Sequence, residues 1–478
     1  MSIDRRALKE RWRRVGPAVM CIALFAFNFS AALAHSHDLQ GRFDLGYFDQ
    51  AAWLVAHGKP VFVTVRGLYL LGDHFSPIFW PMAELTRVFP VNGTLLFVQS
   101  AALALGVLPL WRIARRHAGL ALWPTTAVVA AYALYPPLGN VNLADFHPEV
   151  VAVPALLAAI LCVLERRWVL FAVAIAVALL CKEDFSIVVA ALGLTMLIDP
   201  ETRTAGAITA VVGVVTFFVA TRVVQSHYAG TFVQTTFLSQ YGSNLGQIAK
   251  TMVLHPGRVL SDLTADQNFS FLVAALAPLL FLPLLAPKWI LPAIPIEVLY
   301  LLSTRPDAHR ITGQYTIALS IFLVVAAAFA VALLRGPTQT RLALLLVIAA
   351  LLTNASSGPL HARPWDWLQR EPSTDALLAA AKLVPPGAAV SGTERTWPVL
   401  FDRQDLYGFP APWQGYAPKK DPISLPQRQA GVRYILVDTG DPLQWPSSDA
   451  AALAAFKTQL KLRPLYDKAG IQLYAVGP

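Results

Sequence analysis

The feature that most constrains this chain is a series of apolar runs, each about long enough to cross a bilayer, with arginine-rich segments between them. The first run, 15–34, follows a basic cluster at the N-terminus, and the runs 93–111 and 149–164 lead into further arginines. The basic residues are Arg5, Arg6, Lys9, Arg11, Arg13, Arg14, Arg112, Arg115, Arg116, Arg166 and Arg167. About 20 apolar residues span a hydrocarbon core, and basic residues gather in cytoplasmic loops. The pattern predicts a multi-pass protein of the inner (cytoplasmic) membrane with its N-terminus in the cytoplasm.

Composition supports a membrane environment. Hydrophobic residues make up 56% of the chain and charged residues only 14%, whereas soluble domains carry about a quarter charged residues. A net charge of +9 is also found in nucleic-acid-binding proteins. Here the densest basic cluster directly precedes an apolar run, so we expect membrane lipids and no nucleic acid as partners.

The N-terminus allows two interpretations. Ala32-Leu33-Ala34 resembles a signal-peptidase site after a basic and an apolar region. The run 15–34 is nevertheless long enough to span, which favours an uncleaved anchor. Cys21, Cys162 and Cys181 lie in or beside apolar segments with no paired spacing, so we expect small buried side chains and no disulfide or zinc site.

The whole pattern predicts an α-helical polytopic domain over residues 1–357 with about eleven transmembrane helices. The expected spans are 15–34, 93–111, 118–137, 149–164, two within 168–198, 205–224, 269–286, 289–303, 315–334 and 341–357. The expected outer loops are 35–92, 138–148 and 225–268, and a short amphipathic stretch at 76–89 is expected on the membrane surface.

The apolar stretch 168–198 is interrupted by Lys182-Glu183-Asp184. As one long helix it would bury this triplet and invert every later loop. As two short helices it would bring the triplet to the outer face. Three adjacent ionisable residues in hydrocarbon would cost several kcal/mol, so we favour two helices.

The last segment, 358–478, has a different character. Pro, Gly and Trp punctuate it, 432–438 is typical of a buried strand, and 462–467 with 471–476 predicts a terminal hairpin. Stretches 374–384 and 448–460 are helix-like. We expect a small α/β domain on the extracytoplasmic side.

Polar residues gather in the predicted outer loops. The clusters are HSHD (35–38), FDLGYFDQ (43–50), GDHFSP (72–77) and NLADFHPE (142–149). Asp145, His147 and Glu149 alternate, so in an extended segment they can point the same way and suit Mg²⁺ or Mn²⁺. An unmetallated carboxylate there could instead act as a general base. Pro148-Glu149 is also typical of a helix start, and Asp44 and Asp49 could be solvated loop acids.

Motifs for nucleotide and zinc-protease chemistry are absent. The sequence has no GxxxxGK[ST], no GxGxxG after a strand and no HExxH. We therefore expect no nucleotide cofactor. A group-transfer enzyme acting on the outer face would need a donor already on that side, such as a lipid-linked one.

FDLGYFDQ, GDHFSP, NLADFHPE and CKED (181–184), in this order, resemble an uncharacterised-domain family of predicted bacterial membrane proteins. That family is grouped with the GT-C superfamily of glycosyltransferases. The four motifs cover the first 200 residues. Residues 205–357 match only in hydropathy, and Gln314-Tyr315 stands where the family has His-Tyr.

The resemblance implies a GT-C-like fold and a polyprenyl-phosphate-linked sugar donor used outside the cytoplasm. It implies that Asp44 is the catalytic aspartate of the first outer loop, with Asp49 as the second candidate. It places Asp145, His147 and Glu149 where such enzymes often bind a divalent cation, although D-x-H-x-E departs from the usual acidic pair. The substrate-binding candidates are then Asp73, His74, Lys182, Glu183 and Asp184.

Two other functions remain open from the sequence. A transporter would line its pathway with ionisable residues, but it commonly shows inverted repeats and broken helices at mid-membrane. No repeat is visible here, and the acids lie mainly in loops, which favours the enzyme. A non-catalytic cell-envelope assembly protein is the third alternative.

Overall fold

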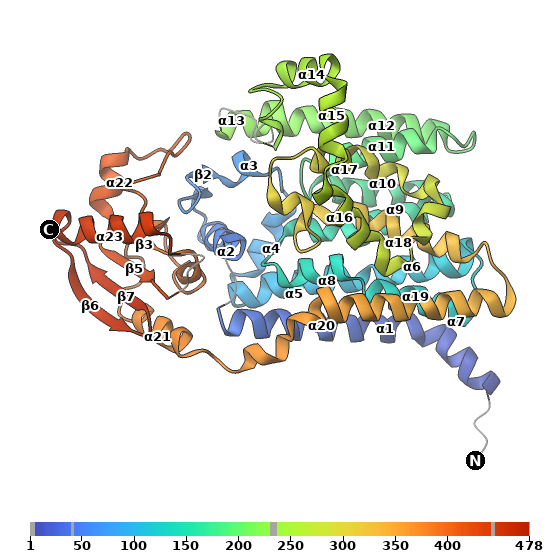
Figure 1. Ribbon diagram of the computed structural model, residues 1–478, viewed down its shortest axis with the longest axis horizontal. Helices are drawn as coiled ribbons and strands as arrows, with labels where there is room; N and C mark the ends of the chain where they lie inside the picture. The colour runs from blue at the N-terminus through green and yellow to red at the C-terminus, as the bar shows by residue number, and fades with distance from the viewer. Residues whose placement is uncertain (1–4, 40–42, 230–236, 441–444, 478) are drawn as a thin grey trace.

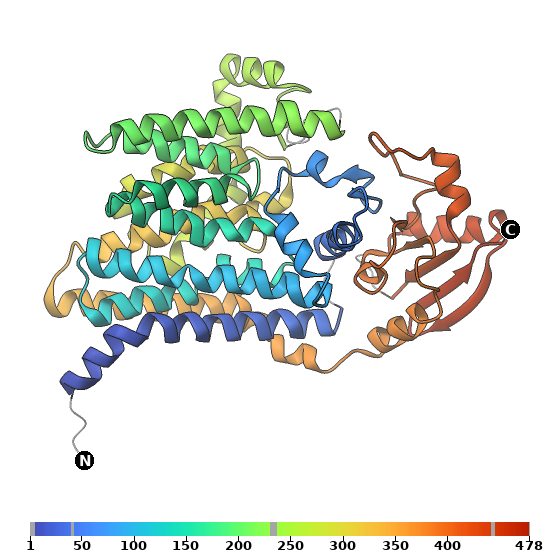
Figure 2. The same ribbon diagram turned by 180° about the vertical axis from the view of Figure 1, so that it is seen from behind.

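The structure is a computed structural model that describes residues 5–39, 43–229, 237–440 and 445–477. A bundle of roughly aligned helices occupies most of the molecule, and a sheet formed near the C-terminus lies at one end of it (Figure 1, Figure 2). The N-terminus lies at the opposite end of the bundle (Figure 1). The first-loop elements around α2 lie between the bundle and the sheet.

Most helices of the bundle follow the apolar runs of the sequence, but Pro136–Leu143, which covers the start of the expected outer loop 138–148, is also helical. The helices of the bundle are α1 (Arg5–His37), α5 (Val91–Leu105), α6 (Val107–Arg112), η1 (Ile113–His117), α7 (Leu122–Ala133), α8 (Pro136–Leu143), η2 (Pro148–Val151), α9 (Ala152–Leu164), α10 (Trp168–Leu179), α11 (Phe185–Met196), α12 (Arg203–Phe218), η3 (Val219–Gln225), α16 (Asp266–Leu276), α17 (Ile294–Leu301), α18 (Ile317–Val331) and α19 (Gly336–Ser357).

Five stretches of the described chain are helical, long and apolar enough to cross a membrane. They are Lys9–His37, Val91–His117, Arg203–Ala229, Gln314–Val331 and Gly336–Leu368. Three shorter apolar helices, Pro148–Leu164, Trp168–Leu179 and Phe185–Met196, lie in the same bundle. The membrane character is thus confirmed, whereas the expected count of about eleven spans is not confirmed.

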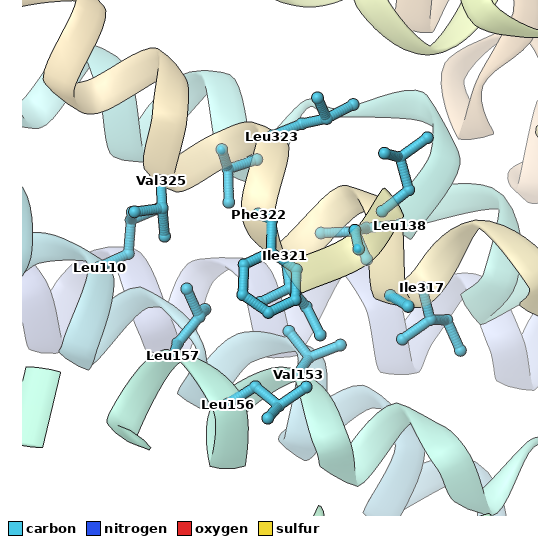
Figure 3. Close-up of a cluster of buried hydrophobic side chains, with 14 of the residues drawn as sticks. Leu110, Leu138, Val153, Leu156, Leu157, Ile317, Ile321, Phe322, Leu323 and Val325 are labelled. Atoms are coloured by element: carbon cyan, nitrogen blue, oxygen red, sulfur yellow. The ribbon is translucent and has the colours of Figure 1, made fainter. Parts of the chain in front are cut away.

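Helix α18 forms the centre of the bundle. It is apolar on all sides, and nearly every one of its residues is buried. Ile321 and Phe322 pack among Leu110, Val153, Leu156 and Leu157 of neighbouring helices (Figure 3). A helix that is hydrophobic all round is expected in such a position, because every face meets another helix or lipid.

The segment 277–293 differs from the two spans expected at 269–286 and 289–303. After α16 the chain passes through four short 3₁₀ turns, η5 (Ala277–Leu279), η6 (Leu282–Leu285), η7 (Pro287–Trp289) and η8 (Leu291–Ala293). Each turn contains one proline near its start: Pro278, Pro283, Pro287 or Pro292. Proline lacks the backbone N–H and clashes with the preceding turn, so a continuous α-helix cannot form.

The break at the Lys182-Glu183-Asp184 triplet is confirmed. Helix α10 ends at Leu179 and α11 begins at Phe185. The turn between them packs on the first loop, because the Ile78 backbone N–H donates to the Leu180 carbonyl at 3.0 Å. The Ser76 hydroxyl donates to the Cys181 carbonyl at 2.7 Å.

The stretch 35–92 is more ordered than the expected polar loop. It folds into α2 (Phe43–Ala56), the hairpin β1 (Phe62–Val63) and β2 (Leu68–Tyr69), α3 (Leu70–Asp73) and α4 (Phe79–Leu85). The motif FDLGYFDQ is therefore the start of a helix, with Asp44 in its first turn. Sequence periodicity missed α2 because it is buried on most sides and shows little amphipathic contrast.

The expected outer loop 225–268 is also largely helical. It contains α13 (Ser226–Ala229), α14 (Leu245–Leu254) and α15 (Pro256–Leu263), while its residues 230–236 lie outside the described part. Short helices follow at η9 (Pro306–His309), η10 (Gln314–Thr316), α20 (Pro359–Ala362) and η11 (Pro364–Leu368).

The C-terminal part contains a five-stranded sheet in the order β4-β3-β5-β7-β6. Its elements are α21 (Pro372–Ala381), β3 (Val390–Gly392), η12 (Glu394–Val399), β4 (Leu406–Gly408), α22 (Leu425–Gly431), β5 (Tyr434–Asp438), α23 (Ser447–Gln459), β6 (Arg463–Lys468) and β7 (Ile471–Ala475). Strands β4, β3 and β5 are parallel, and β6 and β7 form the expected antiparallel hairpin. Successive residues of β5 point to opposite faces of the sheet: Leu436 packs with residues of α21, and Ile435 packs with residues of α23.

Candidate functional site

A cavity of about 720 Å³ lies where the first-loop elements meet the bundle. Side chains from α2, the β2–α3 segment, the loop after α8, the turn between α10 and α11, and residues 305–315 line it together. Of the predicted site residues, it is lined by Asp44, Asp73, His74, Asp145, His147, Lys182 and Asp184. The structure thus brings residues of the separate polar motifs together around one cavity.

Asp44 and Asp145 meet directly in this cavity. The Asp44 backbone N–H, in the first turn of α2, donates to Asp145 Oδ2 at 3.2 Å. First-turn amides of a helix lack partners within the helix, so the Asp145 carboxylate satisfies one of them. Asp44 is half-buried, and burial raises the pKa of its carboxyl, with the Glu149 charge adding to the rise and the His147, His74 and Lys182 charges opposing it.

Asp49, the second catalytic candidate, does not line the cavity. Its side chain is fully buried, and the Asn92 amide, oriented with its nitrogen towards it, donates to both carboxylate oxygens at 2.8 and 2.6 Å. Burial, with a smaller contribution from the Asp145 charge, raises the pKa of Asp49 well above its ordinary value. Neither Asp44 nor Asp49 is a solvated loop acid.

Asp73 and His74 lie at the end of α3. Arg66 Nε donates to Asp73 Oδ2 at 3.2 Å. Burial alone would raise the pKa of Asp73, but the charges of His74 and Arg66 outweigh it and lower that pKa. Burial would lower the pKa of His74, but the carboxylates of Asp73 and Glu183 raise it overall. Positive charge on His74 is therefore favoured by its two acidic neighbours.

Glu183, a predicted substrate-binding residue, does not line the cavity. Its side chain is fully buried, and Oε2 accepts a hydrogen bond from the Phe75 backbone N–H at 2.7 Å. Its Oε1 lies 3.6 Å from His74 Nδ1. Glu183 thus ties the α10–α11 turn to the first loop.

Lys182 lies at the centre of a buried charge cluster. Its Nζ is 3.4 Å from Glu149 Oε1 and 3.5 Å from Asp184 Oδ2. Asp184 also accepts a hydrogen bond from the Tyr300 hydroxyl at 2.8 Å. Two carboxylates around one ammonium compensate the charge of the buried Lys182 side chain.

The predicted metal ligands are not arranged as a ready-made metal site. In the described part of the chain, no three His, Cys, Asp or Glu side chains are placed to hold a metal ion. Glu149 lies in the 3₁₀ turn η2, directly after Pro148, and pairs with Lys182. The backbone at 145–147 is held by Gln99, which donates to the Asp145 carbonyl and accepts from the His147 N–H, each at 2.8 Å. As placed, these residues do not fit a bound divalent cation, and metal dependence stays a prediction.

Several cavity residues carried no sequence signal. Arg305 donates to the Tyr315 hydroxyl at 3.2 Å, and its guanidinium lies 4.7 Å from the centre of the Phe237 ring. Within the described residues it forms no ion pair with a carboxylate. Tyr47, one turn after Asp44, lines the cavity with a hydroxyl that has no hydrogen-bond partner in the described chain. Spacing could have suggested Tyr47, which follows Asp44 by three positions on a helix, but nothing local marks Arg66 or Arg305.

Comparison with known proteins assigns the chain to a family and shows which solved structures share its fold. Residues 35–467 match the predicted membrane protein family DUF2079. No curated protein sequence matches the chain significantly. The fold is similar to the crystal structure of ArnT from Cupriavidus metallidurans bound to undecaprenyl phosphate, with a TM-score of 0.58 and 14% identity over 97% of this chain and 99% of that one.

A second similar structure is the arabinofuranosyltransferase AftD from mycobacteria. Its TM-score is 0.51 at 13% identity, and the match covers 96% of this chain and 40% of that one. At such low identity, the likeness concerns the fold. The chain has the fold of the GT-C glycosyltransferases and belongs to the DUF2079 family of predicted membrane proteins.

Proposed function

We propose that this protein is a membrane glycosyltransferase. It transfers a sugar from a polyprenyl-phosphate-linked donor to an acceptor on the extracytoplasmic face of the membrane. The observation that carries the proposal is one cavity with a half-buried carboxyl of raised pKa, Asp44, and a cation without a carboxylate partner in the described chain, Arg305. The fold likeness to ArnT, whose structure holds undecaprenyl phosphate, supports a lipid-phosphate ligand.

The proposed reaction needs one base and one anion site. Asp44 accepts the proton of the acceptor hydroxyl, while the hydroxyl oxygen forms a bond to the anomeric carbon of the sugar. The bond from that carbon to the phosphate oxygen breaks, and the polyprenyl phosphate leaves with the electron pair. A raised pKa brings Asp44 closer to the operating pH, which strengthens it as a base.

The cations of the cavity suit the leaving phosphate. Arg305 is available for a charge-assisted hydrogen bond to a phosphate oxygen. Lys182 already balances Glu149 and Asp184, so it adds a donor but little net positive charge. Arg66 is engaged by Asp73. We therefore assign the main phosphate contact to Arg305.

A binding experiment tests this assignment. The protein in lipid nanodiscs is titrated with undecaprenyl phosphate, and the Arg305→Gln variant is compared with wild type. A hydrogen bond to a charged group contributes about 1.5–3 kcal/mol, so Arg305→Gln is expected to weaken binding by about tenfold or more. Arg310→Gln is the matched control, because Arg310 is exposed and does not line the cavity.

The outcome separates the proposal from its alternatives. Absence of undecaprenyl phosphate binding in the wild type would end the lipid-donor proposal, and equal loss in the Arg305 and Arg310 variants would end the assignment of Arg305. Transfer from a polyprenyl-phosphate sugar to an acceptor hydroxyl would distinguish an enzyme from a transporter or assembly protein. Treatment with a chelator, followed by Mg²⁺ or Mn²⁺, tests the predicted metal dependence; Asp145→Asn and Glu149→Gln are expected to weaken any response.

A further inference from the structure

One segment of the C-terminal part reaches both the cavity and the helix that carries Asp44. The 3₁₀ helix η12 places Glu394 in the cavity lining and Trp397 against α2. Residues three apart lie on the same side of a 3₁₀ helix. A single turn of the C-terminal part therefore forms a wall of the cavity and supports a second wall.

The contact between Trp397 and α2 is very close. Trp397 is buried, and its indole N–H donates to the Gly392 carbonyl at 2.9 Å, which fixes the ring. A Cβ atom added at Gly46 would lie 2.5 Å from the Trp397 Cβ, closer than two such atoms can approach. The Phe43 ring meets the indole edge-on, with ring centres 5.4 Å apart. Gly46 is thus required for this approach, and it lies only two residues from Asp44.

A second contact holds the far half of α2. The fully buried Gln50 donates to the carbonyls of Arg403 and Gln404 at 3.3 and 3.1 Å. Thr64, from the adjacent hairpin, donates to the Leu406 carbonyl at 2.6 Å and accepts from the Leu406 N–H at 2.9 Å. The edge strand β4 is therefore bonded to the first-loop elements rather than left open.

η12 is itself fixed to the C-terminal sheet. Arg395 donates to Asp438 Oδ2, at the end of β5, at 2.8 Å and to the Thr374 hydroxyl at 2.6 Å. Asp438 and Thr374 are buried. The position of Trp397 is consequently set by the sheet, and α2 is positioned against a rigid support.

We propose that Trp397 is a positioning residue, through which the C-terminal sheet fixes α2 and thereby holds Asp44 in the cavity. The site is then built jointly by the helical bundle and the C-terminal part. This inference rests on the proposed function for its catalytic consequence. Its structural consequence, the position and rigidity of α2, does not depend on the reaction.

The test compares Trp397→Ala, Trp397→Phe and Gly46→Ala in full-length protein in nanodiscs. Hydrogen–deuterium exchange of residues 43–56 reports local opening of α2. We expect faster exchange there in Trp397→Ala and Gly46→Ala, and near wild-type exchange in Trp397→Phe, which keeps an aromatic ring against Gly46.

Undecaprenyl phosphate affinity should stay within about twofold, because Arg305 lies on other elements. Turnover of a polyprenyl-phosphate sugar should fall about tenfold or more, since displacement of a reacting group by about 1 Å can cost two orders of magnitude.

Two controls make the result specific. Trp413→Ala removes a tryptophan that packs on Phe456 within the C-terminal part, and Gly93→Ala adds a Cβ where no atom lies within 4 Å. Both should leave the exchange of residues 43–56 unchanged. The proposal is overturned if Trp397→Ala affects α2 no more than Trp413→Ala does, or if lipid binding falls in parallel with turnover. A wild type that binds no undecaprenyl phosphate would refute the proposed function, while the exchange data would still decide the role of Trp397.

Discussion

The half-buried carboxyl of Asp44 lies near Asp145 and close enough to His74 and His147 to be influenced by their charge. Burial raises its pKa in the folded protein above the unfolded value of about 3.9. The folded protein therefore loses stability as pH rises from the unfolded pKa to the folded pKa, because ionised Asp44 is less favourable in the folded state. Above the folded pKa this loss of stability is complete and no longer changes with pH. We predict that Asp44→Asn raises thermal stability at pH 7 and gives no gain near pH 3. Turnover at pH 7 should fall by about two to four orders of magnitude if Asp44 is the base.

The matched control for this prediction is Asp366→Asn, at an exposed position of η11. It should change neither stability nor turnover, as surface substitutions usually stay within about 0.5 kcal/mol. Thermal unfolding in detergent at the two pH values and a transfer assay at pH 7 are the measurements. Full turnover in Asp44→Asn would rule out the catalytic role.

At the scale of elements, an ion pair holds the α10–α11 turn to η2, and a hydrogen bond holds it to α17. Lys182 bridges Glu149 and Asp184, and Tyr300 binds Asp184. Removing one partner of a buried charge cluster leaves the others uncompensated, at about 3–5 kcal/mol. We predict a loss of this size in the free energy of unfolding for Lys182→Met.

A double-mutant cycle checks that prediction. Lys182→Met combined with Glu149→Gln should destabilise less than the sum of the two single variants, since the neutral amide that replaces the Glu149 carboxylate no longer needs the ammonium. Denaturant unfolding of the purified protein measures all four species. Additive effects would show that the two side chains do not interact energetically.

At the scale of the whole molecule, the elements found at each end of the helical bundle predict the membrane topology. The first-loop elements and the C-terminal sheet lie at one end of the bundle, and the N-terminus with its basic cluster lies at the other (Figure 1). Since basic segments stay in the cytoplasm, we predict that the sheet and the cavity face the extracytoplasmic side. Alkaline phosphatase fused after Pro478 should be active, and green fluorescent protein fused there should be dark.

The same reporters fused after Arg167 should give the opposite result to the fusions after Pro478. Arg167 follows α9 in a predicted cytoplasmic segment, so the fluorescent fusion should be bright there and the phosphatase inactive. A fluorescent fusion after Pro478 would place the cavity on the cytoplasmic side and contradict the proposed donor side.

The sequence alone determined the local features of this protein. Long apolar runs predict helices because lipid requires every backbone polar group to be satisfied within the segment. The cost of burying Lys182-Glu183-Asp184 in hydrocarbon correctly predicted a break between α10 and α11. Two short strand-like stretches, separated by Lys468-Ala469-Gly470, predicted the β6–β7 hairpin. Each of these depends on neighbours in the chain.

Only the tertiary structure decided which distant residues share the cavity. Asp44 and Asp145 meet across 101 positions, and Trp397 reaches Gly46 from the other end of the chain. In the folded protein Glu149 pairs with Lys182, and no metal site is formed by the described residues. Arg305, which has no recognisable motif around it in the sequence, lies in the cavity lining. Hydropathy records how each segment prefers lipid or water. It does not record which helix faces pack together, because side-chain shape and burial across distant segments decide that.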